Sequence, residues 1–252
     1  ALCQHCSDKL FDSTVDKITN DIKESASFGG ESLRTAIQAI SSISKTAGHR
    51  IGKHLINIVP VLLNVAEQIS EKEGEDEVRE YIMQAFENFI ISSPDEFKGY
   101  FDFVLILGKE YIEYDPNYSY DSEDEEEEET GGEEEEEEEE EQGGHDDDDD
   151  VTWKVRKAAA KAINTLIKYR PETLPQVYKD LCNAEETTLP DRFKEREEGV
   201  KIDVLNVFIT LLQQSVVHST NETGEVVIKQ KPEVKNLKDA LDQVMKQLKR
   251  VL

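Results

Sequence analysis

Residues 78–90 read VREYIMQAFENFI, and the spacing of their apolar side chains decides the fold class. The apolar residues recur every three or four positions, which places them in one stripe along an α-helix. The stripe consists of Val78, Tyr81, Ile82, Ala85, Phe86, Phe89 and Ile90. Because such a stripe must be covered by a neighbouring element, the segment predicts one helix of a larger all-α structure.

The same stripe returns three more times along the chain. Residues 155–167 fit the pattern, and residues 33–40 fit it more loosely. Residues 200–212 also fit, with Asp203 breaking one position. Each stripe begins with an apolar residue followed by a base, and the four bases are Arg34, Arg79, Arg156 and Lys201. The bases are 45, 77 and 45 residues apart, and the longer gap contains a 30-residue acidic run. Without that run the period is close to 45 residues, the length of a HEAT or armadillo unit.

The repeat predicts an all-α HEAT-repeat α-solenoid, a right-handed superhelix of antiparallel helix pairs with one long disordered acidic loop. The four stripes are expected to be the second helices of their pairs and to line the concave side. The first helices are expected at roughly residues 8–24, 51–69, 96–113, 173–183 and 233–251. Nothing in the sequence clearly predicts a β-sheet.

The domain organisation follows from the repeat and from the composition. HEAT repeats are expected over residues 1–120 and 151–252, separated by an acidic disordered insert at 121–150. The insert has no apolar side chain to bury, so folding could not repay the entropy of ordering it. Residues 216–232 lack a helical period and contain Asn, Gly and Pro, which predicts a loop inside the second block.

Charge is concentrated in the insert, which holds 22 of the 56 acidic residues and no Lys or Arg. The remaining 34 acidic residues face 29 basic ones, so the chain outside the insert is close to neutral. A net charge of −27 makes nucleic acid an unsuitable partner, because like charges repel. No apolar run approaches the roughly 18 residues that a membrane span requires. The chain does not begin with Met, so a fragment or processed product is expected.

The bases that open the stripes have a structural interpretation. A base at this position is expected to pair with a carboxylate between neighbouring repeats, so that the pairs form a ladder. Candidate partners are Glu73, Asp150 and Glu195, which precede Arg79, Arg156 and Lys201 by six residues each. A role in ligand binding is the weaker interpretation.

No residue pattern in the sequence predicts catalysis. Cys3-Gln4-His5-Cys6 is similar to half of a zinc site or to a redox pair, but zinc needs about four ligands and Cys182 is the only other cysteine. The favoured interpretation is that both cysteines lie at the end of a helix. Nucleophile elbows, phosphate-binding loops and His-Glu-x-x-His motifs do not occur. We therefore predict no catalytic, cofactor-binding or metal-binding residue, no cofactor and no enzymatic activity.

One set of residues is a candidate partner-binding stripe. Lys154, Lys157, Lys161 and Lys168 follow the insert at offsets that place them on one helix face, with Asn164 between them. A solvated helix face is the simpler interpretation. The alternative is a basic stripe that meets an acidic partner or the chain's own acidic insert.

Four runs of residues resemble a known family. They are AGHRIG at 47–52, YDPNYSYD at 114–121, WKVRKAAAK at 153–161 and RFKEREEGVK at 192–201. In this order they resemble the cullin-associated and neddylation-dissociated protein family, whose members are long HEAT-repeat solenoids. The resemblance covers residues 1 to about 212 and fades over 216–252. It implies an early internal portion, of about five repeats, of a longer chain.

The resemblance implies a non-enzymatic regulator of ubiquitin ligases. Members of the family bind cullin–RING scaffolds that lack the ubiquitin-like modifier and promote the exchange of substrate-receptor adaptors. The implied partners are a cullin and its RING subunit, with no nucleic acid and no membrane. The chain alone is expected to be a monomer in the cytoplasm and nucleus. Two other classes stay open: an importin-β-like karyopherin, which is also an acidic HEAT solenoid, and a basic-protein chaperone that uses the acidic insert directly.

Overall fold

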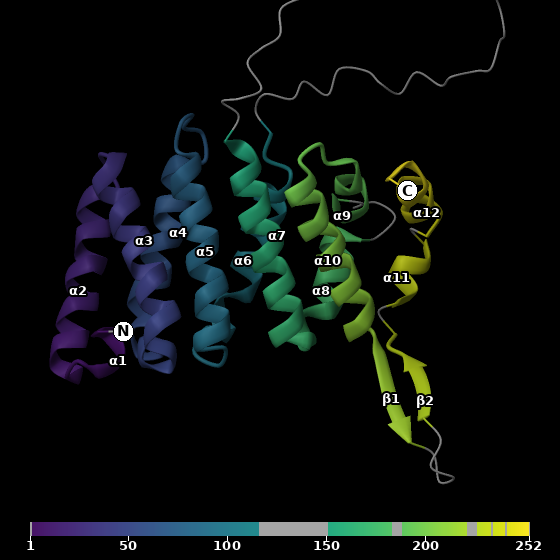
Figure 1. Cartoon of the computed structure of the whole chain (residues 1–252), viewed down its shortest axis with the longest axis horizontal. Helices are drawn as coiled ribbons and strands as arrows, with labels where there is room; N and C mark the ends of the chain where they lie inside the picture. The colour runs from purple at the N-terminus through teal and green to yellow at the C-terminus, as the bar shows by residue number, and fades with distance from the viewer. Residues whose placement is uncertain are drawn as a thin grey trace, which may run out of the picture.

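The computed structural model describes residues 2–115, 151–182, 188–220, 226–232, 234–239 and 241–251. Within these ranges the chain is almost entirely helical, and the helices lie side by side in an elongated array (Figure 1). The strands in these ranges form one two-stranded hairpin. The predicted all-α solenoid is therefore confirmed, whereas the predicted acidic insert at 121–150 lies outside the described residues.

Four second helices pack against one another along the array. They are α3 (Gly30–Ala47), α5 (Asp76–Ser92), α7 (Thr152–Tyr169) and α10 (Glu198–Gln214). Each contacts the next one in the chain, and Figure 1 shows them in this order. The four predicted stripes lie on these helices. Most of their apolar residues are buried, and Ile82, Phe86 and Phe89 have no exposed surface, whereas Tyr81 is half-buried and Leu212 is 39% exposed.

Four first helices precede the second helices in the chain. They are α2 (Asp8–Ser25), α4 (Leu55–Ile69), α6 (Phe101–Ile112) and α8 (Leu174–Leu181), which match the predicted ranges to within a few residues. Short 3₁₀ turns at Gly48–His54, Lys98–Tyr100 and Pro171–Thr173 lead into α4, α6 and α8. Pro60 lies inside α4, which continues on both sides of it.

Shorter elements complete the described chain. α1 (Leu2–His5) precedes α2, and α9 (Thr188–Asp191) followed by a 3₁₀ turn (Arg192–Lys194) lies between α8 and α10. The last predicted helix, at 233–251, is instead divided into α11 (Val234–Asp239) and α12 (Leu241–Val251). α12 contacts α9 and the 3₁₀ turn that follows it, so it extends the array.

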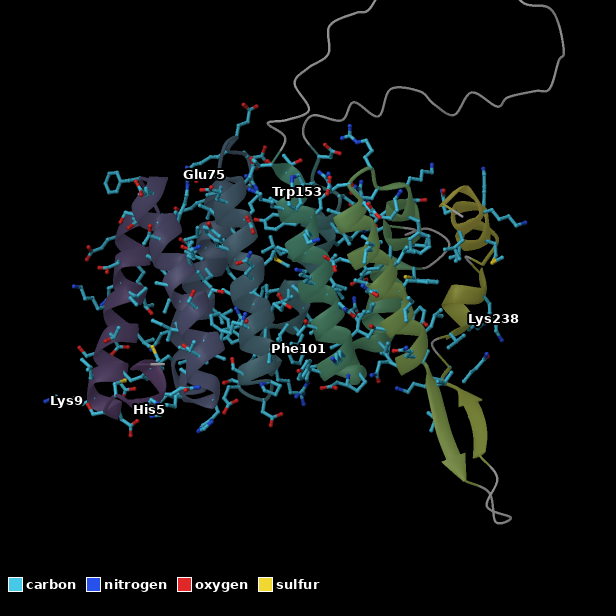
Figure 2. All side chains as sticks on the ribbon, in the orientation of Figure 1. His5, Lys9, Glu75, Phe101, Trp153 and Lys238 are labelled. Carbon is cyan, nitrogen blue, oxygen red and sulfur yellow. The ribbon has the colours of Figure 1, made fainter. Side chains whose placement is uncertain are left out.

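The second helices all run in the same direction, which gives the array two distinct edges. Figure 2 shows Glu75 and Trp153, at the starts of α5 and α7, at one edge, and Phe101, at the start of α6, toward the other. The first of these edges also holds the α4–α5 turn. Gly74 in that turn has φ +76°, a left-handed conformation that glycine adopts without steric cost.

One apolar core runs through the array, and it includes a group of aromatic rings on and beside α5. Phe86, Phe89 and Phe97 form a cluster with ring centroids 5.9–6.4 Å apart. At Gly108, α6 approaches α7 so closely that an added Cβ would lie 2.9 Å from Ile163. Close packing of this kind makes each helix pair depend on its neighbours for stability.

The loop predicted at 216–232 is wrong for most of its length. β1 (Val216–Thr220) and β2 (Val226–Gln230) pair antiparallel, with register from Val216 opposite Gln230 to Thr220 opposite Val226. Both strands begin with β-branched valines, which favour extended backbone, and the absence of a helical period did not exclude this. The base of the hairpin is held by Ser215, whose carbonyl accepts a hydrogen bond from Lys231 N at 2.9 Å.

Candidate partner-binding surface

The four predicted lysines lie along α7, in the middle of the row of second helices, and we call them the lysine row. Lys154 and Lys157 are half-buried, and Lys161 and Lys168 are exposed. α7 contacts α5 on one side and α10 on the other. The lysines are therefore flanked by two helices, and the side chains of those helices decide how much positive charge remains available to a partner.

Lys157 is committed to α10. Its Nζ lies 3.3 Å from Asp203 Oδ2 and donates a hydrogen bond to the Gly199 carbonyl at 3.0 Å. Asp203 is the residue that interrupts the apolar stripe of residues 200–212. The interruption thus has a structural cause, because the carboxylate links two neighbouring second helices through an ion pair.

The α5 side of the lysine row is acidic. Burial raises the pKa of Glu80 above the ordinary glutamate value, and the positive charges of Lys154 and Lys161 oppose that shift. Burial likewise raises the pKa of Glu87, again opposed by Lys161. Carboxylates of α5 therefore neutralise part of the charge of the lysine row across the α5–α7 contact.

The two ends of the lysine row differ as a result. Lys157 joins α7 to α10, and the half-buried Lys154 has its Nζ 5.8 Å from the centroid of the Trp153 ring. Among the described residues, no ion pair joins Lys161 or Lys168 to a carboxylate. The structure thus does not present four equivalent lysines, and the pair Lys161 and Lys168 is the more available part of the stripe.

The repeat register contains a signal that identifies the neighbours of the lysine row. Glu80 precedes Lys157 by 77 residues and Ile202 follows it by 45, the spacings that separate Arg79, Arg156 and Lys201. The three residues occupy one repeat position on α5, α7 and α10. That position is acidic on α5, basic on α7 and apolar on α10, where Ile202 is 52% exposed.

A base-to-carboxylate pair between neighbouring repeats forms at Arg156, but its partner is Glu195, which the six-residue offset assigned to Lys201. Arg156 Nε and Nη2 donate to the two carboxylate oxygens of Glu195 at 2.9 and 3.1 Å, and both side chains are almost fully buried. Arg156 also donates to the Tyr114 carbonyl at 3.1 Å and to Thr152 Oγ1 at 2.9 Å. One guanidinium thus joins the end of α6, the start of α7 and the segment before α10.

The predicted ladder partners therefore require correction, because Glu195 pairs with Arg156 and Arg192 rather than with Lys201. Arg79 donates to the carbonyls of Ile69 and Lys72 at 2.6 and 2.8 Å, and its ion pair is with Asp76 in its own helix rather than with Glu73. The backbone carbonyls of the α4–α5 turn take the place of the expected carboxylate. Arg34 does cross to the next repeat, where it pairs with Glu77 at 3.0 Å. Asp150 lies outside the described residues.

The cysteines near the start of the chain lie beside an arginine. Arg50 donates to the backbone carbonyls of Cys3 and Cys6 and forms an ion pair with Asp8 at 2.9 Å. Among the described residues, no group of three or more metal-ligating side chains is brought together. No helix in the described ranges is long and apolar enough to span a membrane.

Comparison with known proteins gives a consistent set of relatives. No family model matches the chain. The chain is 46% identical over 220 residues to Cullin-associated NEDD8-dissociated protein 1 of Arabidopsis thaliana, a match that covers 86% of this chain and 17% of the relative. It is 43% identical over 215 residues to Cullin-associated NEDD8-dissociated protein 2 of Mus musculus. It is 41% identical over 232 residues to Cullin-associated NEDD8-dissociated protein 1 of Dictyostelium discoideum.

The resemblance seen in the four sequence runs is thus confirmed over most of the chain. The chain spans 17–18% of the length of these relatives. The quoted runs contain the buried residues Ile51, Arg156 and Phe193, so they form part of the core of the array. This chain is therefore a sequence relative of one segment of the cullin-associated NEDD8-dissociated protein family.

Proposed function

We propose that this chain is part of a non-enzymatic regulator that binds cullin–RING scaffolds lacking the ubiquitin-like modifier. The observation that carries the proposal is the 46% identity, over 86% of the chain, to a protein named as cullin-associated and NEDD8-dissociated. The solenoid supports it, because a row of parallel helices offers an extended surface for another protein. Exchange of substrate-receptor adaptors is assigned to the longer protein, of which this chain matches about one sixth.

The proposal includes the surface and the setting. The scaffold, a cullin with its RING subunit, would meet the row of second helices, where Lys161 and Lys168 are exposed. The chain would act as a monomer in the cytoplasm and nucleus, without nucleic acid, membrane or cofactor. Its net charge of −27 supports the exclusion of nucleic acid.

A pull-down distinguishes this proposal from the other two classes. The immobilised chain is offered a purified cullin–RING complex with and without the modifier, the nuclear GTPase in its GTP form, and core histones. We expect retention of the unmodified cullin–RING complex and weaker retention of the modified one. Retention of the GTPase alone would instead identify a karyopherin, and retention of histones alone a basic-protein chaperone.

Reversing the charge of the available lysines should slow binding. A Lys161→Glu, Lys168→Glu variant is expected to lower the association rate constant for the cullin–RING complex roughly five- to tenfold at low salt, with little change in dissociation, because exposed charges mainly steer encounter. Stopped-flow or surface-based kinetics measures this. The matched control is Lys9→Glu, Lys17→Glu on α2, which makes the same charge change on exposed residues of a first helix. Equal rate constants for the two variants would show that the stripe is only a solvated face.

A further inference from the structure

A groove lies between α2 and α4, on the first helices of the array. Its volume is about 450 Å³, within the range of sites that bind small molecules and short peptides. The groove belongs to first helices, whereas the lysine row belongs to second helices. It therefore presents a surface separate from the one proposed to bind the cullin–RING scaffold.

The α4 wall of the groove is held in place from behind. Ile58, Val59, Leu62 and Val65 on the opposite face of α4 have no exposed surface and belong to the core. The side chains that face the groove are therefore carried by a helix fixed through its buried side. A preformed wall lowers the entropy cost of binding a ligand.

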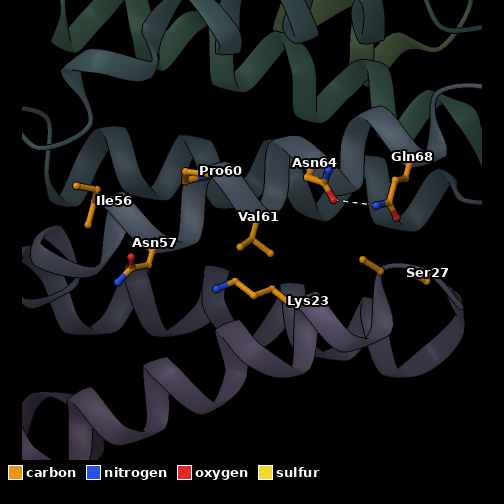
Figure 3. A pocket seen from close by; sticks show the side chains of 9 residues that line it. Lys23, Ser27, Ile56, Asn57, Pro60, Val61, Asn64 and Gln68 are labelled. Atoms are coloured by element: carbon orange, nitrogen blue, oxygen red, sulfur yellow. Dashed lines mark hydrogen bonds between the residues drawn. The ribbon is translucent and has the colours of Figure 1, made fainter.

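The lining combines apolar side chains with a row of amides. Ile56, which is 71% exposed, lies with Pro60 and Val61 along the groove. Asn57, Asn64 and Gln68 provide the amides, and Gln68 Nε2 donates to Asn64 Oδ1 at 2.8 Å (Figure 3). That bond leaves the Asn64 NH₂ group as a donor and the Gln68 carbonyl as an acceptor for a ligand. Both groups can form hydrogen bonds with the backbone of a bound peptide.

The charge of the groove favours a ligand with negative charge. Lys23 extends from α2 across the groove toward Asn57 (Figure 3), and the lining contains no carboxylate. Lys23 forms no ion pair with a carboxylate of the described residues. A second groove, beside α3, is lined by Asp21 and Glu31 and by no base, so it would repel an anion. Only the α2–α4 groove of this pair suits an acidic ligand.

We propose that the α2–α4 groove binds an extended peptide segment that carries an acidic side chain next to an apolar one. Lys23 would meet the carboxylate, Ile56 and Val61 would contact the apolar side chain, and Asn64 would bond the peptide backbone. All four residues line the groove. The proposal does not depend on cullin binding, because no residue of the lysine row takes part.

Selection from a peptide library tests the proposal directly. The immobilised chain is panned against phage-displayed random heptapeptides, and the enriched sequences are synthesised and measured by fluorescence anisotropy. We expect enrichment of peptides with Asp or Glu beside an aliphatic or aromatic residue. Lys23→Glu and Asn64→Ala should each weaken their binding about fivefold or more.

A matched control on the same helix separates the groove from general charge. Lys17→Glu makes the same change on an exposed residue of α2 outside the groove and should alter binding less than about twofold. Thermal melting of each variant checks the fold, and all three substituted residues are exposed. The proposal is overturned if no peptide is enriched above a chain-free surface, if the enriched peptides lack acidic residues, or if Lys23→Glu binds them as tightly as the unaltered chain does.

Discussion

Replacing Phe86 with alanine is expected to lower the free energy of unfolding by about 3–5 kcal/mol, because the change leaves a cavity in a closely packed core. Phe86 has no exposed surface, and its ring lies 6.4 Å from that of Phe89 and 5.9 Å from that of Phe97. α5 contacts both α3 and α7, so it is a central helix of the array. Thermal or urea unfolding measures the loss.

The site of the damage is a second readout of the same variant. In a solenoid each repeat depends on its nearest neighbours, so hydrogen exchange should quicken most in α5, α3 and α7 and least in α12. Phe28→Ala is the matched control, since Phe28 is 91% exposed and its loss should cost less than about 0.5 kcal/mol. Equal melting of the Phe86→Ala and Phe28→Ala variants would contradict the assignment of α5 to the core.

Replacing Glu195 with alanine is expected to cost a similar amount, about 3–5 kcal/mol, for an electrostatic reason. Glu195 is 3% exposed and accepts two hydrogen bonds from Arg156, which is 1% exposed. It also forms an ion pair with Arg192. Removing the carboxylate takes away the negative charge that faces two buried guanidinium groups. The loss should fall near the lower end of the range, because Asp115 Oδ2 remains 3.7 Å from Arg156.

The same pair predicts a dependence of stability on pH. Burial alone would raise the pKa of Glu195, but the charges of Arg192 and Arg156 outweigh it and hold the pKa below the ordinary glutamate value. A lowered pKa in the folded state stabilises the protein above the unfolded value, about pH 4.3, and that stabilisation is lost as the pH falls through the folded value. Unfolding measured from pH 7 to pH 3 should therefore show a larger acid-induced loss of stability in the unaltered chain than in the Glu195→Ala variant.

An exposed ion pair supplies the control for this experiment. Arg34 and Glu77 approach to 3.0 Å, but the Glu77 side chain is 50% exposed. Water screens such a pair, so Glu77→Ala should cost about 0–1 kcal/mol. If Glu195→Ala lowers the free energy of unfolding no more than Glu77→Ala does, the buried ion pair does not hold α7 to the segment before α10.

The arrangement of helices could be read from the sequence because it depends on local spacing. Residues 78–90 place seven apolar side chains on one helix face, and the 45-residue recurrence of that face requires stacking of similar units. The first helices were located to within a few residues for the same reason. The repeat spacings of 77 and 45 residues also link Glu80, Lys157 and Ile202, so the sequence contains the acidic, basic and apolar residues that share this position on the second helices.

The hairpin and the partners of the bases depended on tertiary structure. Residues 216–232 lack a helical period, but whether two short valine-rich runs pair depends on where the ends of α10 and α11 lie. Likewise, a six-residue offset assigns Glu195 to Lys201 and Glu73 to Arg79. In the structure, Glu195 instead accepts hydrogen bonds from Arg156, and Arg79 donates to the carbonyls of Ile69 and Lys72.

The lysine row and the α2–α4 groove show the same division between local and tertiary information. The sequence places four lysines on one helix face, and packing against α5 and α10 leaves two of them half-buried, one in an ion pair with Asp203, and two exposed. The groove brings together Lys23 and Asn64, which are 41 residues apart, and no periodicity relates them. Periodicity determines which face of a helix is buried, whereas distances between side chains of different helices are set by how those helices pack.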